Sequence, residues 1–379
     1  MIKLKKISFV LLLSLLIFLA GCSQQVCNKT ARAEKVKNVI FCIGDGMGTA
    51  HITLARIKSR GIDGKLNMEQ MPVTGWIRTH SADSAVTDSA AAGTALAVGV
   101  KTDNKMIGMT ADGTKYQTIL EAVKEKGFAT GLVVTSAITH ATPASFGSHV
   151  TRREMENEIA EQLIENEITV LFGGGREFFL PKANRKSKRN DQRDLIVQAR
   201  ALGYLYIETA AQLKKVRDGK VLGLFQDGAL TTEKPEPSLA ELTEKALEIL
   251  SKDEDGFFLM VEGSQIDWKA HENNADGVVK QLIDFDEAVK VAVDFASRDG
   301  QTLVIVTADH ETGGLTITGG DLEGKLDLNF STGGHTGVPL PVYAFGPGAE
   351  EFGGVHDNTE IPKKFADFLG IKPFPKKLK

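Results

Sequence analysis

The chain has 379 residues, with 45 lysines and arginines against 49 aspartates and glutamates, so its formal net charge is −4. Loss of the N-terminal lysines by processing would shift this charge to about −7, and no basic stripe is visible, which argues against nucleic acid as a dedicated partner. The residues after the first 35 are enough for one large α/β domain or two smaller ones.

The N-terminal segment has the pattern of an export signal. Three lysines within the first six residues precede an apolar run, Ile7–Ala20, which is short for a membrane span and typical of a signal peptide. Leu19–Cys22 resembles the lipobox of bacterial lipoproteins, which implies acylation of Cys22; the alternative is an ordinary cleaved signal with a stray cysteine. We therefore expect a signal peptide over 1–21, a lipid-anchored tether over 22–35, and a lipoprotein of the bacterial cell envelope on its periplasmic or surface side.

Short apolar or β-branched runs alternate with helical patterns along the rest of the chain. Strands are expected at Val36–Ile43, Phe128–Thr135, Thr169–Phe172, Phe257–Val261 and Thr302–Thr307, and helices at Tyr116–Lys126, Arg153–Asn166, Ser238–Leu250 and Val278–Ala296. The strand runs are continuously apolar rather than alternating, so we expect them to be buried on both faces. This predicts an α/β fold, a three-layer α/β/α sandwich with a mostly parallel central sheet.

Residues that commonly bind metals follow four of the expected strands. In chain order they are Asp45, His140, Thr142, Glu262, Asp309 and His310. Because ligands of open α/β sheets bind outside the carboxyl ends of the strands, we expect these side chains to share one rim. Several carboxylates at one rim need charge compensation, and bound cations supply it.

Two further segments have metal-ligand spacing. Asp267 and His271 are four residues apart, which places both on one face of a helical turn, and His335 lies among glycines that allow close approach. The sets suited to zinc are Asp267, His271 and His335 on one side and Asp45, Asp309 and His310 on the other, and the set suited to magnesium is Asp45, Thr142 and Glu262. A lone Asp–His pair after a strand is more often a capped turn, so the prediction depends on the whole set.

The segment Thr87–Ala95 opens a helix of small residues. Asp88 is suited to cap this helix, and Ser89 would lie in its first turn, where free N–H groups attract anions. A serine hydroxyl is a weak nucleophile until a base or a metal activates it, and no histidine is its neighbour in sequence. We therefore expect zinc to activate Ser89; the alternative is an alanine-rich helix start with a simple cap.

As a set, these motifs resemble those of the alkaline phosphatase family. The similar segments are Gly44–Gly48, Asp88–Ala90, His140–Pro143, Val261–Gly263, Ile266–Asp267, Thr307–His310 and Gly334–Gly337, in the family's order. The resemblance covers the chain from about Val36 to Phe368. It implies a catalytic domain over 36–379 that hydrolyses phosphate monoesters with broad alcohol specificity, through a phosphoserine intermediate, and releases inorganic phosphate at alkaline pH.

The resemblance also implies two zinc ions and one magnesium ion. The implied ligands are Ser89, Asp45, Asp309 and His310 for one zinc, Asp267, His271 and His335 for the other, and Asp45, Thr142 and Glu262 for magnesium. Arg153, thirteen residues after His140, matches the family's phosphate-clamping arginine, and its neighbour Arg152 is the competing assignment.

Two positions depart from the best-known bacterial pattern. His140 stands where an aspartate often orients a magnesium-bound water, which puts magnesium affinity in doubt, and Trp268 stands where a lysine or histidine often approaches the phosphate. Only 24 residues separate His310 from His335, so the module that crowns the site in larger relatives is short here. The resemblance implies a homodimer, although a short crown leaves its interface open.

Three rival functions share some of these features. Sulfatases need a Cys/Ser-x-Pro-x-Arg motif, whereas three alanines follow Ser89. A phosphodiesterase is harder to exclude. A surface lipoprotein that binds phosphate or metal without turnover would not be expected to retain the serine together with every ligand.

Overall fold

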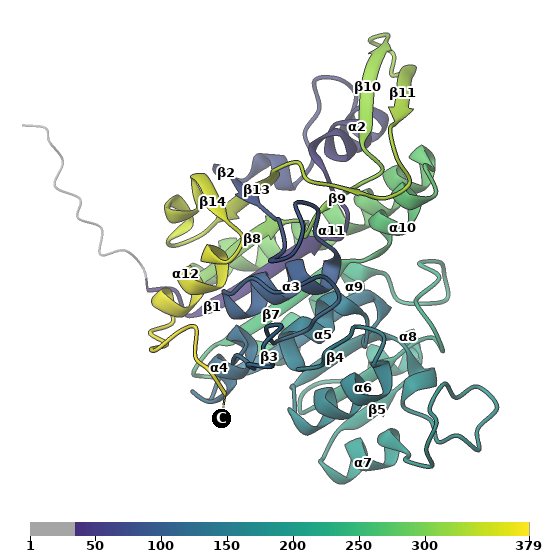
Figure 1. Cartoon of the computed structure of the whole chain (residues 1–379), viewed down its shortest axis with the longest axis vertical. Helices are drawn as coiled ribbons and strands as arrows, with labels where there is room; N and C mark the ends of the chain where they lie inside the picture. The colour runs from purple at the N-terminus through teal and green to yellow at the C-terminus, as the bar shows by residue number, and fades with distance from the viewer. Residues whose placement is uncertain (1–34, 379) are drawn as a thin grey trace, which may run out of the picture. The chain divides into compact units, whose positions relative to one another are not determined.

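The structure is a computed structural model that describes residues 35–378. Outside the described residues lie the expected signal peptide (1–21) and the expected tether (22–35) with Cys22, except for the last residue of the tether. The described part forms one compact unit around a large central sheet (Figure 1). Within 35–378, no helix has both the length and the apolar character to cross a bilayer.

The central sheet has ten strands. Their spatial order is β14 (Gly354–Asp357), β2 (Val73–Arg78), β13 (Leu340–Phe345), β8 (Thr302–Thr307), β1 (Asn38–Gly44), β7 (Phe257–Gly263), β3 (Ala129–Ala137), β4 (Val170–Gly174), β6 (Val221–Leu224) and β5 (Leu205–Ile207). All neighbours are parallel, except that β13 runs antiparallel to both β2 and β8. The predicted, mostly parallel sheet is confirmed.

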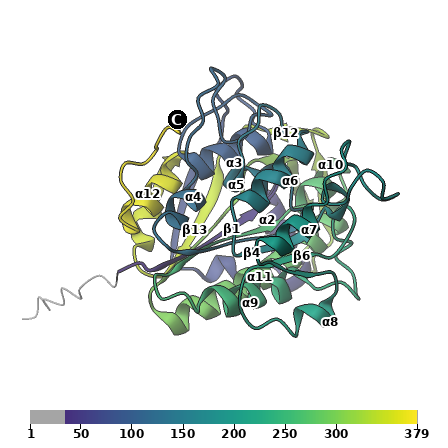
Figure 2. The same cartoon turned by 90° about the horizontal axis from the view of Figure 1, so that it is seen from below.

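Helices cover both faces of this sheet, which completes the predicted three layers (Figure 2). One layer contains α3 (Ser89–Val98), α4 (Ile119–Lys124), α5 (Ala141–Gly147), α6 (Glu156–Glu165) and α12 (Glu360–Phe368), and the other contains α2 (Thr49–Arg60), α9 (Leu239–Leu250) and α11 (Ala275–Asp299). The shorter elements are α7 (Leu195–Ala201), α8 (Ala210–Leu213), α10 (Gln265–His271) and the 3-10 turns η1 (Met68–Gln70), η2 (Arg176–Phe178) and η3 (Ala349–Phe352).

The five strands predicted from sequence are β1, β3, β4, β7 and β8, each within two residues of its predicted bounds. Every residue of β1, β4, β7 and β8 is buried, as continuous apolar runs require. Phe41 of β1 shows how the layers are joined: its ring meets Phe146 of α5 edge-on at 6.2 Å and Phe365 of α12 at 5.2 Å between centroids. Such offset aromatic contacts stabilise the core beyond their buried area.

The crown expected over the site is a short hairpin. Its strands β10 (Leu315–Gly320) and β11 (Leu326–Phe330) project from the described unit near α2 (Figure 1). At its base, β9 (Glu311–Thr312) pairs with β12 (His335–Thr336). The hairpin therefore begins and ends at the segments that carry the predicted ligands His310 and His335.

The sequence-predicted helix Tyr116–Lys126 is shorter in the structure because a capping box fixes its start. The Thr118 hydroxyl accepts the Glu121 N–H, and the Glu121 carboxylate accepts the Thr118 N–H. The carboxylate of Glu121 also receives a ring nitrogen of His149 at 3.0 Å. Burial alone would raise the pKa of Glu121, but His149 outweighs it and the pKa lies below its usual range. Burial alone would lower the pKa of His149, but Glu121 raises it.

We expect Glu121→Gln to lower the free energy of unfolding by about 1–3 kcal/mol at pH 6, because it removes the charge that pairs with His149. Since the folded pKa of His149 is raised, its contribution is full below about pH 6.5 and is lost as the pH rises through the folded value. The stability that Glu121 contributes is lost only at acid pH, as the pH falls through its lowered pKa. Urea unfolding of both proteins at pH 6 and pH 9 tests this: an equal deficit at both values would contradict it.

Candidate active site

The carboxyl ends of four central strands carry most of the predicted ligands. β8, β1, β7 and β3 lie side by side in this order, and the parallel register aligns Ile43 with both Glu262 and Thr307. Asp45, two residues beyond Ile43, is therefore next to Glu262 on one side and Asp309 on the other. The predicted ligands share one rim because these four strands are neighbours in the sheet.

We call Asp267, His271 and His335 the Asp267 cluster. Nε2 of His271 lies 3.3 Å from Oδ2 of Asp267, one turn away on α10, and 3.2 Å from Nε2 of His335. The hydrogen bond that His271 donates to Asp267 raises the pKa of His271 to about 9. Burial opposes ionisation of Asp267, but His271 and the nearby His310 hold its pKa below the usual range. Two imidazoles and a carboxylate thus converge on one point.

We call Asp45, Asp309 and His310 the Asp309 cluster. Nε2 of His310 lies 3.5 Å from Oδ1 of Asp45 and 3.2 Å from Oδ2 of Asp309, and all three side chains are fully buried. The hydroxyl of Ser89 faces the same point, with its Oγ 3.2 Å from Nε2 of His310. The sequence-predicted partners of Ser89 are therefore its neighbours in space.

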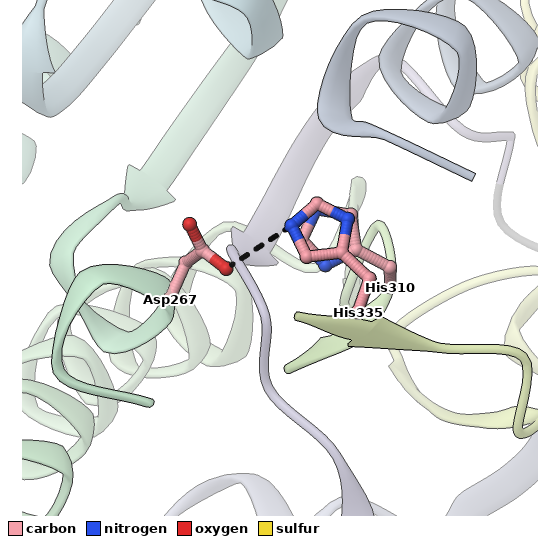
Figure 3. Close-up of side chains that lie close together, drawn as sticks. All are labelled: Asp267, His310 and His335. Carbon is pink, nitrogen blue, oxygen red and sulfur yellow. Dashed lines mark ion pairs between the residues drawn. The ribbon is translucent and has the colours of Figure 1, made fainter. Parts of the chain in front are cut away.

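The two clusters adjoin one another. The rings of His310 and His335 stack with their centroids 3.5 Å apart, and Asp267 faces this pair, its Oδ1 3.7 Å from Nε2 of His335 (Figure 3). Ligand atoms of these three residues lie within 4.8 Å of one another. Two cations bound in the two clusters would be close neighbours.

We call Asp45, His140 and Glu262, whose ligand atoms also lie within 4.8 Å of one another, the Glu262 cluster. Thr142, in the first turn of α5, is fully buried beside it. The sequence predicted an all-oxygen set of Asp45, Thr142 and Glu262, with His140 where an aspartate often orients a magnesium-bound water. In the structure the imidazole of His140, the N-cap of α5, lies close to this set. Burial and then Arg153 lower the pKa of His140 to about 3, so its ring is neutral.

The buried carboxylates fit bound cations. Among residues 35–378, no hydrogen-bond partner reaches either carboxylate oxygen of Asp45, Oε1 of Glu262 or Oδ2 of Asp309. Burial, Asp309 and Asp267 raise the pKa of Asp45 well above its usual range, and burial raises that of Glu262 to about 7. Buried charges that lack partners are costly, and divalent cations would remove that cost.

Ser89 and Arg153 are joined by Asp88. Oδ1 of Asp88 accepts the Ala91 N–H at 3.0 Å and so caps α3, whose first residue is Ser89. Oδ2 of Asp88 accepts Nη1 of Arg153 at 3.2 Å. Arg152, the competing assignment, has a side chain that is 60% exposed and pairs with Glu154, whereas Arg153 pairs with Asp88, the neighbour of Ser89 in the chain.

Comparison with known proteins shows the family to which the chain belongs. The family model described as alkaline phosphatase matches residues 36–328. The chain belongs to the alkaline phosphatase family. It is 38% identical to alkaline phosphatase 3 of Bacillus subtilis (strain 168), over 88% of this chain and 89% of that protein, and 35% identical to the alkaline phosphatase of Escherichia coli (strain K12), over 89% and 87%.

Among solved structures, the alkaline phosphatase from the Antarctic bacterium TAB5 is similar with a TM-score of 0.82 and 38% identity, covering 90% of this chain and 99% of that one. A further structure of that enzyme is a histidine-to-aspartate variant with magnesium bound in its M3 site. This alkaline phosphatase is accordingly a phosphomonoesterase, which excludes a binding protein without turnover and a sulfatase.

The three histidines that are candidate metal ligands are oriented by their Nδ1 atoms. Nδ1 of His271 lies 2.7 Å from the Gly333 carbonyl, and Nδ1 of His335 lies 2.9 Å from the Thr87 carbonyl. A carbonyl only accepts, so Nδ1 donates in both rings and Nε2 is the atom that faces the cluster; a cation bound there would take the place of the proton that Nε2 of His271 shares with Asp267. The contact to Thr87 also ties the Asp267 cluster to the segment that carries Ser89.

Sequence reasoning missed Thr312 and Ser264, which hold ligands in place. The Thr312 hydroxyl donates to Oδ1 of Asp267 at 2.5 Å and so accepts from Nδ1 of His310 at 3.2 Å, which frees Nε2 of His310. The Ser264 hydroxyl donates to Oε2 of Glu262 at 2.6 Å. Each lies two residues beyond a ligand in the sequence, which is the only signal that could have pointed to them.

Trp268 follows Asp267 on α10 and covers His140. The two rings meet edge-on, with centroids 5.9 Å apart. Both positions that depart from the common bacterial pattern are therefore in contact, and position 268 places an aromatic ring beside His140, whose Nε2 lies 3.2 Å from Nη2 of Arg153.

Proposed function

We propose that this alkaline phosphatase acts through a phosphoserine at Ser89, with two zinc ions in the Asp267 and Asp309 clusters and one magnesium ion in the Glu262 cluster. The observation that carries the proposal is the convergence of three groups of candidate ligand atoms beside a serine hydroxyl, with carboxylate oxygens of Asp45, Asp309 and Glu262 buried and without a hydrogen-bond partner among residues 35–378. Imidazole with carboxylate suits zinc. Asp45, Thr142 and Glu262 supply the oxygens that suit magnesium, although the imidazole of His140 makes that cluster less selective.

When bound, the cations supply positive charge that polarises the phosphoryl group and stabilises the oxygens that gain negative charge. Arg153 binds two phosphoryl oxygens with its forked guanidinium, which Asp88 holds in place. The N-terminus of α3 adds positive potential at the phosphoryl group, because the side chain of Asp88 caps only the N–H of Ala91 in its first turn.

The reaction consists of two transfers at phosphorus. Oγ of Ser89 loses its proton and forms a bond to phosphorus, while the bond to the ester oxygen breaks and the alcohol leaves with that electron pair and takes up a proton. Water then attacks the phosphoserine: its oxygen forms a bond to phosphorus and loses a proton, while the bond to Oγ breaks and Oγ takes up a proton, which restores Ser89 and releases inorganic phosphate. Loss of the serine proton is easier at high pH, so activity rises into the alkaline range.

These contacts all go to the phosphoryl group, so we expect broad tolerance of the alcohol. The test has two parts: turnover of p-nitrophenyl phosphate against bis-p-nitrophenyl phosphate, and mass spectrometry of the acid-quenched enzyme. Monoester turnover should dominate, with phosphate found on the peptide that contains Ser89. Faster turnover of the diester, or phosphate on another residue, would refute the proposal.

We expect Trp268→Lys to lower the inhibition constant of inorganic phosphate about fivefold to tenfold. A cation close to the site would improve the binding free energy of the phosphate dianion by about 1 kcal/mol. In the natural protein the absence of that cation weakens product binding and speeds its release. Trp268→Met, which has a similar length and no charge, is the control. The idea fails if the lysine variant binds phosphate no better than the methionine variant.

The cell-envelope location remains a proposal that rests on the Leu19–Cys22 motif. Detergent phase partitioning tests it: the full chain should enter the detergent phase, and Cys22→Ala should not. If both stay in the aqueous phase, lipidation is excluded.

The homodimer is likewise a proposal. Trp76 and Val355, which are cross-strand partners on β2 and the edge strand β14, are 38% and 66% exposed. Exposed apolar side chains at a sheet edge are suited to an interface. Sedimentation equilibrium of the wild type and of Val355→Lys should show loss of a dimer in the variant; a wild-type monomer would exclude it.

A further inference from the structure

The segment Asp103–Lys105 has no role in the mechanism above, yet it contacts both catalytic segments. Oδ1 of Asn104 accepts the backbone N–H of Asp88 at 2.9 Å, and Nδ2 of Asn104 donates to the Val86 carbonyl at 3.1 Å. The backbone N–H of Asn104 donates to Oδ1 of Asp83 at 3.0 Å. One side chain thereby holds both ends of the three residues that precede Ser89.

Lys105 extends the connection to Arg153 through its backbone alone. Its N–H donates to Oδ1 of Asp88 at 3.1 Å, and its carbonyl accepts the N–H of Arg153 at 2.8 Å. Lys105 has φ = 75°, a left-handed backbone conformation that is strained for a residue with a long side chain and easy only for glycine. Such strain persists only where the surroundings over-determine the backbone, and it is common beside functional sites.

The other end of this loop is fixed to the helix of the nucleophile. The Thr94 hydroxyl, five residues after Ser89 on α3, donates to the Met106 carbonyl at 3.2 Å and accepts the Gly108 N–H at 3.0 Å. The loop therefore cannot move independently of α3. It is a rigid link between the backbone at Asp88 and the backbone at Arg153.

We propose that Asn104 is a positioning residue of the phosphatase reaction. By fixing the backbone of Val86–Asp88, and through Lys105 that of Arg153, it sets the separation between the Ser89 hydroxyl and the guanidinium that binds the phosphoryl group. The inference rests on the roles proposed for Ser89 and Arg153. Asn104 itself would touch no substrate; it would act through Ser89 and Arg153, which do.

A purely structural role for Asn104 is the alternative, since asparagine often stabilises loops through backbone hydrogen bonds. The two roles differ in what they change. Loop stabilisation alone would alter the unfolding midpoint and leave the active enzyme with normal kinetics. A positioning role also alters phosphate affinity and kcat/KM, because misplacement by about 1 Å can lower rates on the order of 100-fold.

The experiment compares Asn104→Ala, Asn104→Asp and Asp112→Ala in the metal-loaded enzyme. Asp112 accepts hydrogen bonds from Thr110 and Thr114 in the same loop and is exposed, so it controls for loop stability. We expect Asn104→Ala to lower kcat/KM for p-nitrophenyl phosphate on the order of 10- to 100-fold and to raise the inhibition constant of inorganic phosphate. Asn104→Asp, which can still accept from Asp88 but cannot donate to Val86, should lose less. Asp112→Ala should keep kcat/KM within about twofold.

A double-mutant cycle with Arg153→Ala separates the possible outcomes. If Asn104 acts by setting the separation between Ser89 and the Arg153 guanidinium, removal of the guanidinium leaves nothing to set, and the double variant is no slower than Arg153→Ala alone. Losses that multiply, or unchanged phosphate inhibition in Asn104→Ala, would overturn the positioning role. If Asn104→Ala does not fold, the same comparison with the near-isosteric Asn104→Asp decides. An Arg153→Ala variant of full activity would instead refute the proposed function itself.

Discussion

Ser89→Ala is expected to lower kcat for p-nitrophenyl phosphate by at least about 10³-fold, because the atom that forms the bond to phosphorus is removed. The fold should not change. Alanine is a good helix former, and the cap from Asp88 to the Ala91 N–H does not involve the serine side chain. The loss is therefore expected in kcat, with the unfolding midpoint and the metal content unchanged.

Steady-state kinetics with metal analysis of the same sample measures this effect. Asp88→Asn is an informative companion, because it keeps the shape of the cap but removes the charge that holds Arg153. It should show a smaller loss and weaker phosphate inhibition. Retention of more than a tenth of the wild-type kcat by Ser89→Ala would show that another group attacks phosphorus.

Removal of divalent cations is expected to abolish activity and to destabilise the fold. Without cations, Asp45, Glu262 and Asp309 keep buried oxygens that lack hydrogen-bond partners among residues 35–378, and burial, with Asp309 nearby, raises the pKa of both Asp45 and Glu262. An ion that binds only the folded state adds about 4 kcal/mol of stability at 1,000 times its dissociation constant. The chelated protein should therefore melt at a clearly lower temperature.

Differential scanning calorimetry and activity with and without chelator test this expectation. Chelator saturated with zinc and magnesium is the control, and re-addition of each metal alone shows which cluster it fills. Restoration by zinc of most activity, and by magnesium of the remainder, agrees with the proposed assignment. An unchanged melting temperature and full activity after verified metal removal would contradict it.

The sequence by itself predicted the local parts of this enzyme. The continuous apolar run Val36–Ile43 favoured a strand buried on both faces, and β1 is such a strand over Asn38–Gly44, so a mostly parallel sheet could be predicted. The i, i+4 spacing of Asp267 and His271, and Asp88 as a helix cap before Ser89, are determined by helix geometry alone. The family motifs then grouped residues that are far apart in the chain, and the structure brings them together.

Only the tertiary structure decided which strands are neighbours and what fills the space between them. The insertion of antiparallel β13 between β2 and β8 left no periodic signal, and neither did the entry of His140 into the Glu262 cluster or the stacking of His310 on His335. The links through Thr312 and Asn104 also join residues distant in sequence. Periodicity determines which face of an element is buried, whereas contacts between elements depend on packing of the whole chain, which no local pattern encodes.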